Sequence, residues 1–369
     1  MSLGPYESMD NNLKYKGNRL FKPLNEVREF SPPDLSKRHL DVKENKKWEN
    51  IMHVFNAIHT ATFNFMDKGG VIFFDLPITT RMISSPGALT GLIPSDVNPF
   101  ELKFFDYNTF LTQSSQLYLE FAINAQNVKE VYCWDKSFRK EPADFRHLPE
   151  FTHIEYEGRI NFEQNLEVQE EFLKYIIQFL LKKSLDDLKL FLLDDDIDSL
   201  ENITKLGHFQ KIKFFDAFNL LYEKTKNKKY QKVSIKNFNA YEEVLLTQIM
   251  DGKPVFVTNY IGDEVAFYHA PDPNDLKLVK NADLMFPGFG ELIGSGERVN
   301  TREETEAKAK HFELDMNDYR AYIESRDPKN PIIHSGWGMG IERCIQCMFK
   351  LPFIWEAKVF PRLHNSERP

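Results

Sequence analysis

The sequence predicts an α+β protein built from hairpins of strands and from long amphipathic helices. Two strand-like segments flank a polar turn in residues 138–157, and a strand with alternating glycines leads into an apolar helix in residues 334–349. Apolar residues recur at helical spacing in residues 47–67 and 164–185, which is typical of helices that bury one face. A chain of 369 residues can bury one large core or two smaller ones around such elements.

Composition and charge exclude several classes of protein. The 32 phenylalanines indicate a chain that folds rather than one that stays disordered. No apolar run of about 18 residues predicts a membrane span, and the N-terminus lacks the apolar segment of a secretory signal. The net charge of −8 argues against a protein whose main task is to coat nucleic acid.

The cysteines indicate a compartment rather than a site. The whole chain has only three cysteines, which predicts a reducing, cytoplasmic environment. Cys344 and Cys347 form a C-x-x-C pair, but this pair lies on an apolar helix without a second pair of ligands. We therefore expect both to be core residues rather than metal ligands.

Several shorter segments have predictable secondary structure. Residues 104–110 predict one strand, and residues 254–261 predict another that pairs with residues 265–270. Residues 302–312 and 317–326 predict surface helices because their apolar positions are few.

The hairpin of residues 138–157 places unusual chemistry on one face of a sheet. Side chains two residues apart share a face of a strand, so each strand of the hairpin contributes alternate residues to that face. Two more polar residues lie in the loop between the strands. The groups brought together are Arg139, Glu141, Arg146, His147 and Phe151.

A nucleoside triphosphate needs groups of these kinds. Arg139 can clamp a phosphoryl oxygen through its planar guanidinium, Phe151 offers a surface on which a base stacks, and Glu141 can accept from an exocyclic amine. Arg146 and His147 can neutralise terminal phosphates. The alternative is a solvated hairpin laced by salt bridges, and this stretch alone favours neither reading.

A second stretch supports the nucleotide interpretation. Gly336, Gly338 and Gly340 are two residues apart, so one face of their strand has no side chains and a flat ligand can approach the backbone. Arg343 follows at the junction between this strand and a helix, where it is placed for phosphate or for stacking on a base.

Together these stretches resemble the second and third signature motifs of class II aminoacyl-tRNA synthetases, and more narrowly the catalytic domain of the asparaginyl/aspartyl-tRNA synthetase group. Residues 47–77 resemble the first motif of the class, which builds the dimer interface, and residues 358–362 resemble the end of the catalytic domain. The resemblance covers residues 36–369. It implies an antiparallel sheet of about six strands flanked by helices, in a homodimer.

The same resemblance divides the chain. Residues 1–35 are expected to form an N-terminal arm or extension, and residues 36–369 the catalytic domain, with an insertion around 186–250. Enzymes of the group normally carry an anticodon-binding β-barrel of about a hundred residues ahead of this domain. Since 35 residues are too few for five strands, no such barrel is expected within this chain.

The resemblance assigns roles to the polar residues, with ATP and Mg²⁺ as cofactors. Arg139 would bind the α-phosphate and the substrate carboxylate, Glu141 would contact adenine, and Phe151 with Arg343 would sandwich the base. Arg146 and His147 would hold the distal phosphates. These are the catalytic and nucleotide-binding residues that the resemblance implies.

Residues 282–298 resemble the metal- and substrate-binding hairpin of the group. Asp283 and Glu291 would carry Mg²⁺, because two carboxylates and phosphate oxygens suit its octahedral coordination. The alternative is a solvated acidic hairpin.

Residues 112–120 resemble the segment of the group that binds the amino acid. Gln113 and Gln116 of this segment would bind the substrate, with Gln116 contacting its backbone, and Arg298 would meet its side-chain oxygen. Aspartyl enzymes have a lysine at Leu119, and the neighbouring Glu120 would accept from a carboxamide and repel a carboxylate. This favours asparagine over aspartate, unless Glu120 only pairs with Arg298 or faces solvent.

Three functions stay open at this level. The first is an asparaginyl-type synthetase that activates asparagine (or aspartate) and charges tRNA. The second is an AMP-forming asparagine synthetase that uses aspartate and ammonia. The hairpin loop favours this second reading, because it is one residue shorter than the loop of asparaginyl enzymes and lacks its basic residues. The third is a catalytically silent relative that binds a partner. None of the three involves a membrane.

Overall fold

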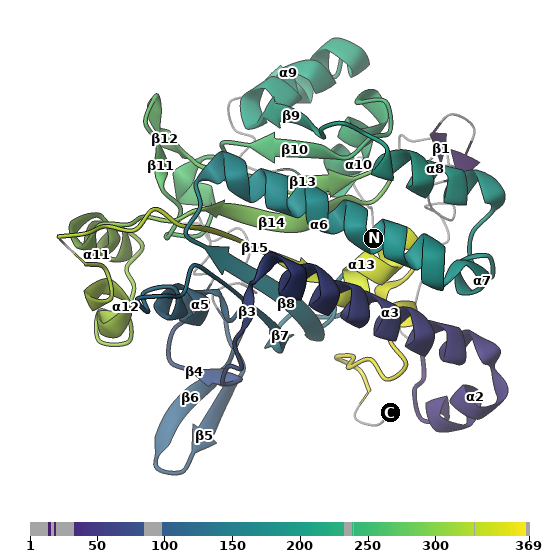
Figure 1. Ribbon diagram of the computed structural model, residues 1–369, viewed down its shortest axis with the longest axis horizontal. Helices are drawn as coiled ribbons and strands as arrows, with labels where there is room; N and C mark the ends of the chain where they lie inside the picture. Colours follow the sequence, from purple (N-terminus) through teal and green to yellow (C-terminus); the bar gives the residue numbers. More distant parts are fainter. Residues whose placement is uncertain are drawn as a thin grey trace.

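The computed structural model describes residues 14–15, 18–19, 33–84, 98–231, 238, 240–327 and 329–366 (Figure 1). The predicted arm of residues 1–35 lies mostly outside these ranges. Among the described residues, no helix is both long and apolar enough to cross a membrane.

An eight-stranded sheet forms the centre of the molecule. Its six inner strands pair antiparallel, which confirms the predicted sheet of about six strands, and one short strand pairs parallel at each edge. In spatial order the strands are β3 (Ile72–Phe73), β7 (Glu130–Phe138), β8 (Glu150–Gly158), β15 (Ser335–Gly340), β14 (Gly290–Glu297), β13 (Asn281–Phe286), β10 (Val255–Thr258) and β9 (Gln210–Lys213).

Two long helices cover one face of this sheet. They are α3 (Lys46–Gly69) and α6 (Phe162–Lys183), which confirm the two predicted amphipathic helices and pack side by side (Figure 1). The sequence sets their ends: Gly70 closes α3 in the left-handed region with φ of 72°, and a capping box starts α6. Under them, Trp337 of β15 stacks on Tyr156 of β8, with ring centroids 5.6 Å apart.

Shorter helices complete the main layer and its edges. A second, smaller core gathers around α9 (Phe214–Thr225), where Phe218 stacks on Phe238. The helices are α2 (Arg38–Glu44), α5 (Gln116–Ala122), α7 (Leu185–Leu188), α8 (Asp194–Thr204), α9 (Phe214–Thr225), α10 (Ala240–Ile249), α11 (Arg302–His311), α12 (Arg320–Glu324) and α13 (Ile341–Met348). Cys344 and Cys347 are buried on α13 as core residues, as predicted.

Two predicted strands were wrong. Residues 104–110 contain a turn, with φ of 52° at Phe105, between β5 (Glu101–Phe104) and β6 (Tyr107–Leu111). These strands and β4 (Thr79–Thr80) form a separate sheet (Figure 1). Residues 265–270 form no strand, and β10 pairs instead with β13 and β9.

Candidate active site

A cleft of about 460 Å³ lies against the central sheet. Side chains of β8 alternate between the core under α3 and α6 and this cleft, so Ile154 and Tyr156 are core residues whereas Phe151, His153 and Glu155 line the cleft. Ten of the twelve predicted site residues line it: Gln116, Arg139, Glu141, Arg146, His147, Phe151, Asp283, Glu291, Arg298 and Arg343. The other two, Gln113 and Glu120, are buried outside this lining.

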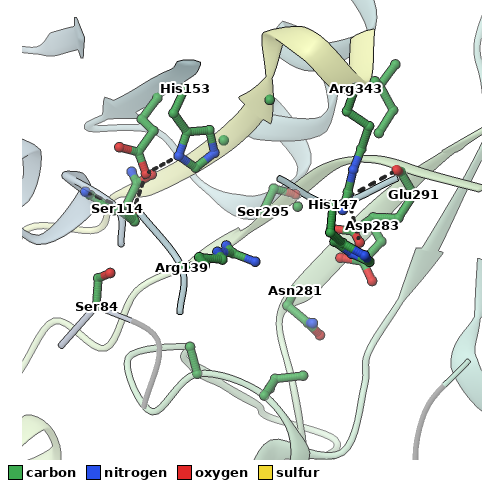
Figure 2. Close-up of a pocket in the computed structure, with 18 of the residues that line it drawn as sticks. Ser84, Ser114, Arg139, His147, His153, Asn281, Asp283, Glu291, Ser295 and Arg343 are labelled. Carbon is green, nitrogen blue, oxygen red and sulfur yellow. Dashed lines mark hydrogen bonds and ion pairs between the residues drawn. The ribbon is translucent and has the colours of Figure 1, made fainter. Parts of the chain in front are cut away.

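The cleft has two chemically different sides. Figure 2 shows His147, Asp283, Glu291 and Arg343 together on one side and Ser114 with His153 on the other, while Arg139 projects between them. The first side carries the residues predicted for ATP and metal, and the second leads to the residues predicted for the amino acid.

The alternating glycines of β15 serve a different purpose from the one predicted. A Cβ atom on Gly336 would lie 2.1 Å from Oε2 of Glu157, and one on Gly338 would lie 2.8 Å from Nε2 of His153. These two glycines therefore make room for side chains of β8 rather than for a ligand. Only Gly340 matches the expectation, because the nearest atoms to a Cβ there belong to Phe151 and Arg343, both at 3.7 Å.

On the nucleotide side, Phe151 and Arg343 therefore lie next to Gly340, which has no side chain of its own. The guanidinium of Arg139 lies 5.6 Å from the centroid of the Phe151 ring. Arg343, in the first turn of α13, contacts the carboxylate of Glu291 at 3.2 Å. This arrangement can hold a flat base between Phe151 and Arg343 and its phosphate beside Arg139.

Asp144 organises the loop that joins β7 and β8, and sequence reasoning missed it. Its Oδ1 accepts from the backbone N–H groups of Arg146 and His147, each at 2.8 Å, and its carboxylate contacts Nδ1 of His147. Burial is the largest single influence and raises the pKa of Asp144, but the hydrogen bonds and charges of His147 and Arg146 together outweigh it, so the pKa is lowered. The available signal was an aspartate two residues before Arg146 and three before His147, the pattern of an Asx turn.

The predicted metal ligands lie together. A Cβ atom on Gly294 would be 3.3 Å from Oε1 of Glu291 and 3.7 Å from Oδ1 of Asp283, so both carboxylates converge over this glycine. Burial and the neighbouring Glu291 raise the pKa of Asp283 well above its ordinary value. A divalent cation would neutralise this pair, so the residues fit Mg²⁺. In the ranges described, no three acidic, His or Cys residues form a complete metal site, so ATP oxygens would have to supply the further ligands.

The amino-acid side is built around Arg298. Its guanidinium is 3% exposed, and its Nη2 lies 3.2 Å from Oε2 of Glu157. Gln116 donates to the same oxygen at 2.5 Å, and Nδ1 of His334 contacts the other oxygen at 2.8 Å. Burial, followed by the charge of Arg326, lowers the pKa of His334 to about 3, so its imidazole is neutral at pH 7.

Glu120 has two partners that sequence reasoning missed. Its carboxylate is fully buried, accepts from the Tyr322 hydroxyl at 2.8 Å, and forms an ion pair with Arg326. It also lies 3.8 Å from Nε of Arg298, which is the pairing considered as an alternative to substrate contact. The prediction that residues 317–326 form a surface helix was wrong on this side, because Tyr322 and Arg326 are buried.

Glu155 is a buried carboxylate in the cleft with a strongly shifted pKa. Ser114 and the backbone N–H of Ser115 donate to it, but burial outweighs them and raises its pKa to about 7. Because its folded pKa lies above its ordinary value of 4.5, Glu155 reduces stability as the pH rises through this interval.

We expect Glu155→Gln to remove this pH dependence. Relative to the variant, the free energy of unfolding of the wild type should fall by up to about 3 kcal/mol between pH 4.5 and pH 7 and then stay level. Urea unfolding of both proteins at several pH values measures the difference. Parallel curves for the two proteins would contradict the assignment.

Comparison with known proteins agrees with this geometry. A sequence model of the family described as tRNA synthetases class II (D, K and N) matches residues 32–364. The chain therefore belongs to the class II aminoacyl-tRNA synthetases of this group, whose members are ATP-dependent ligases.

Solved structures narrow the likeness to asparaginyl- and aspartyl-tRNA synthetases. Asparaginyl-tRNA synthetase from Pyrococcus horikoshii, complexed with asparaginyl-adenylate, is 31% identical with a TM-score of 0.80, over 91% of this chain and 73% of that chain. Asparaginyl-tRNA synthetase from Entamoeba histolytica is 22% identical, with a TM-score of 0.77 over 94% of this chain and 75% of that one. A putative aspartyl-tRNA synthetase from Leishmania major Friedlin is 21% identical, with a TM-score of 0.75 over 91% of this chain and 69% of that chain. The last two show the shared fold.

Proposed function

We propose that this protein activates asparagine with ATP, forming asparaginyl-adenylate and pyrophosphate, and then transfers the asparaginyl group to tRNA. The observation that carries the choice of asparagine is the charge balance around Arg298. The complex of the Pyrococcus enzyme with asparaginyl-adenylate is consistent with this choice.

The proposed reaction needs positioning and charge rather than a protein nucleophile. A carboxylate oxygen of the amino acid attacks the α-phosphorus of ATP, the bond from that phosphorus to the bridging oxygen breaks, and pyrophosphate leaves. Arg139, between the two sides of the cleft, would orient both reacting groups and stabilise the charge on the α-phosphate. A bound Mg²⁺ supplies charge neutralisation for the pyrophosphate, and Asp283 with Glu291 would hold it.

The remaining nucleotide contacts follow from the lining of the cleft. Phe151 and Arg343 would hold the adenine, and Glu141 would accept from its exocyclic amine. Arg146 and His147 would meet the outer phosphates.

The pocket favours a neutral side chain on the substrate. Two buried cations, Arg298 and Arg326, are paired with two buried carboxylates, Glu157 and Glu120. The carboxylate of aspartate would add a negative charge without a free partner in this cluster, whereas the carboxamide of asparagine adds none. Burial raises the pKa of Glu157 as well as that of Glu155, which indicates that further negative charge is disfavoured here.

Binding of unreactive adenylate analogues tests this choice. We would compare sulfamoyl-adenosine carrying asparagine with the same compound carrying aspartate, by isothermal titration calorimetry. We expect the asparagine compound to bind at least about tenfold more tightly, because one buried charge is left uncompensated in the other complex. Equal or tighter binding of the aspartate compound would contradict the proposal.

A specific observation favours a second candidate, the AMP-forming synthesis of asparagine from aspartate and ammonia. The loop between β7 and β8 lies against the body of the protein instead of projecting from it. Its Ala143 N–H donates to His364, its Phe145 carbonyl accepts from Ile354, and its Leu148 is buried. Such a loop offers little to a tRNA end, and a small nucleophile needs no such contact.

The proposal includes a homodimer in a reducing cytoplasm. Large apolar side chains of α3 and of the segment through β3 are exposed in the single chain: Met52, Phe63, Ile72, Phe73, Phe74 and Ile78. A second copy would cover them, as the first motif of the family implies. Sedimentation should give twice the 43.3 kDa of the chain; a monomer at micromolar concentration would contradict the proposed homodimer.

The three cysteines are free and buried, which supports the proposed reducing cytoplasm.

A further inference from the structure

We propose that Glu243 is a positioning residue for Arg146. It holds the guanidinium at the wall of the cleft, in the orientation in which Arg146 meets the outer phosphates of ATP. This inference rests on the proposed ATP site, and it assigns a function to a residue of α10 that carries no recognisable motif.

The two side chains form a bidentate ion pair. Nη1 of Arg146 lies 2.6 Å from Oε2 of Glu243, and Nη2 lies 3.2 Å from Oε1. Both side chains line the cleft, yet they are only 9% and 7% exposed. Two parallel charge-assisted bonds fix the plane of a guanidinium as well as its position, which a single contact does not.

The backbone of β14 closes around this pair. The N–H of Glu291 donates to Oε2 of Glu243 at 3.0 Å, so one oxygen serves both Arg146 and the strand that carries a proposed metal ligand. At Gly290, where φ is 106°, a Cβ atom would lie 2.3 Å from the same oxygen and 3.2 Å from Nη1 of Arg146. Only glycine leaves room for the carboxylate here, and the carboxylate has no space in which to shift toward the strand.

A second contact docks the helix that presents Glu243. The hydroxyl of Thr247, one turn further along α10, accepts from the backbone N–H of Gly288 at 3.1 Å. Helix α10 is therefore attached both to the turn between β13 and β14 and to the start of β14. The position of Arg146 is tied through Glu243 to the hairpin that bears Asp283 and Glu291, so the phosphate-binding and metal-binding parts of the cleft are held in one frame.

Pre-organisation gives this arrangement an effect on binding. A long, flexible arginine side chain loses rotamer freedom when it binds phosphate, and a guanidinium already held in place has lost that freedom in advance. Without Glu243, Arg146 would lose its rotamer freedom only when ATP binds, and this entropic cost would weaken ATP binding. The inference therefore predicts weaker ATP binding rather than slower chemistry once ATP is bound.

Equilibrium binding of ATP·Mg²⁺ to the full chain, by isothermal titration calorimetry, measures this effect. We expect Glu243→Gln and Glu243→Asp to weaken ATP binding by roughly tenfold, since each loses part of the bidentate contact. In exchange of pyrophosphate into ATP, the KM for ATP should rise while kcat and the KM for the amino acid change little. The aspartate variant retains the charge, so it gives an answer even where the glutamine variant is poorly folded.

Glu242 provides a matched control. It is the neighbouring residue of α10, its side chain is 6% exposed against 7% for Glu243, and it pairs with Lys229 outside the cleft. Glu242→Gln should leave ATP binding unchanged within the error of the titration. If it weakens ATP binding as much as Glu243→Gln, the effect belongs to the stability of α10 and the inference is overturned.

A double-mutant cycle separates action through Arg146 from any other action. We expect Glu243→Ala to weaken ATP binding in the wild type and to have no further effect in an Arg146→Ala background. Equal effects in both backgrounds would overturn the inference. If the wild type binds ATP and the Glu243 variants bind it equally well, the inference is overturned and the proposed function stands. If the wild type binds no ATP, both are overturned.

Discussion

Replacing Arg139 with alanine is expected to lower kcat/KM for amino-acid activation by about 100- to 1000-fold. Its guanidinium projects into the cleft and contacts the Phe151 ring, and in the part of the chain that the structure describes it forms no ion pair (Figure 2). By contrast, Arg146, Arg298 and Arg343 are all paired with carboxylates. Within the described residues, no carboxylate therefore engages Arg139, so its whole guanidinium can face a ligand, and the proposed reaction concentrates charge beside it.

The same substitution should leave the fold intact, because no ion pair is lost. Exchange of pyrophosphate into ATP measures activity, and thermal unfolding measures stability. Lys140→Ala is the matched control, since Lys140 is the adjacent residue, is exposed and does not line the cleft. Activity of Arg139→Ala within threefold of the control, or a large loss of stability, would contradict the assignment of Arg139.

Replacing Arg326 with leucine is expected to destabilise the protein by about 3–5 kcal/mol, because buried Glu120 would lose its close ion-pair partner and keep only the more distant Arg298. The Tyr322 hydroxyl would remain at 2.8 Å, but a hydroxyl does not neutralise a carboxylate. The charge of Glu120 would then be shared only with Arg298, 3.8 Å away, so asparagine activation should fall together with stability.

A second substitution separates charge from packing. Adding Glu120→Gln to Arg326→Leu removes the orphaned charge and should recover most of the lost stability. Urea unfolding of the two single variants and the double variant measures the interaction. If Arg326→Leu is as stable as the wild type, or if the double variant is less stable than either single variant, the buried network does not behave as the geometry indicates.

Local patterns predicted much of the fold and most of the cleft. The two hairpin strands, the glycine strand and the two long helices each have a period that the sequence displays within a few residues. Strand alternation placed Phe151 on the cleft face of β8. Arg139 and Glu141 also line the cleft, but the prediction that they share a strand face was wrong, because β7 ends at Phe138 and both residues lie in the loop that follows it. The family resemblance then supplied Asp283 and Glu291 on another hairpin.

Contacts between distant segments could not be predicted in this way. Glu243 meets Arg146 across 97 residues, and Arg326 meets Glu120 across 206. Nothing in the local pattern of α10, or of the segment that follows α12 and carries Arg326, indicates a partner, since charged residues in such short segments usually face solvent. The interpretation of Gly336 and Gly338 failed for the same reason: their missing side chains make room for Glu157 and His153 on a neighbouring strand.

The turn at Phe105 shows a different limit. A left-handed φ of 52° at phenylalanine is uncommon, and no glycine or proline marks the turn. Asp106, next to the turn, was the one available signal, and the aromatic residues around it favoured a single strand. The pairing of Glu101–Phe104 with Tyr107–Leu111 decides the backbone there, and that pairing is not visible in the composition of either strand.

The central claim is that the protein activates asparagine with ATP and does not synthesise asparagine from aspartate. ATP turnover with Mg²⁺ should be followed in three mixtures, containing asparagine alone, aspartate alone, and aspartate with ammonium, with pyrophosphate, AMP and amino acids measured in each. The proposal predicts exchange of pyrophosphate into ATP with asparagine, and no asparagine formed from aspartate. Formation of asparagine and AMP from aspartate and ammonium would contradict it and establish the second candidate, and no turnover in any mixture would contradict both.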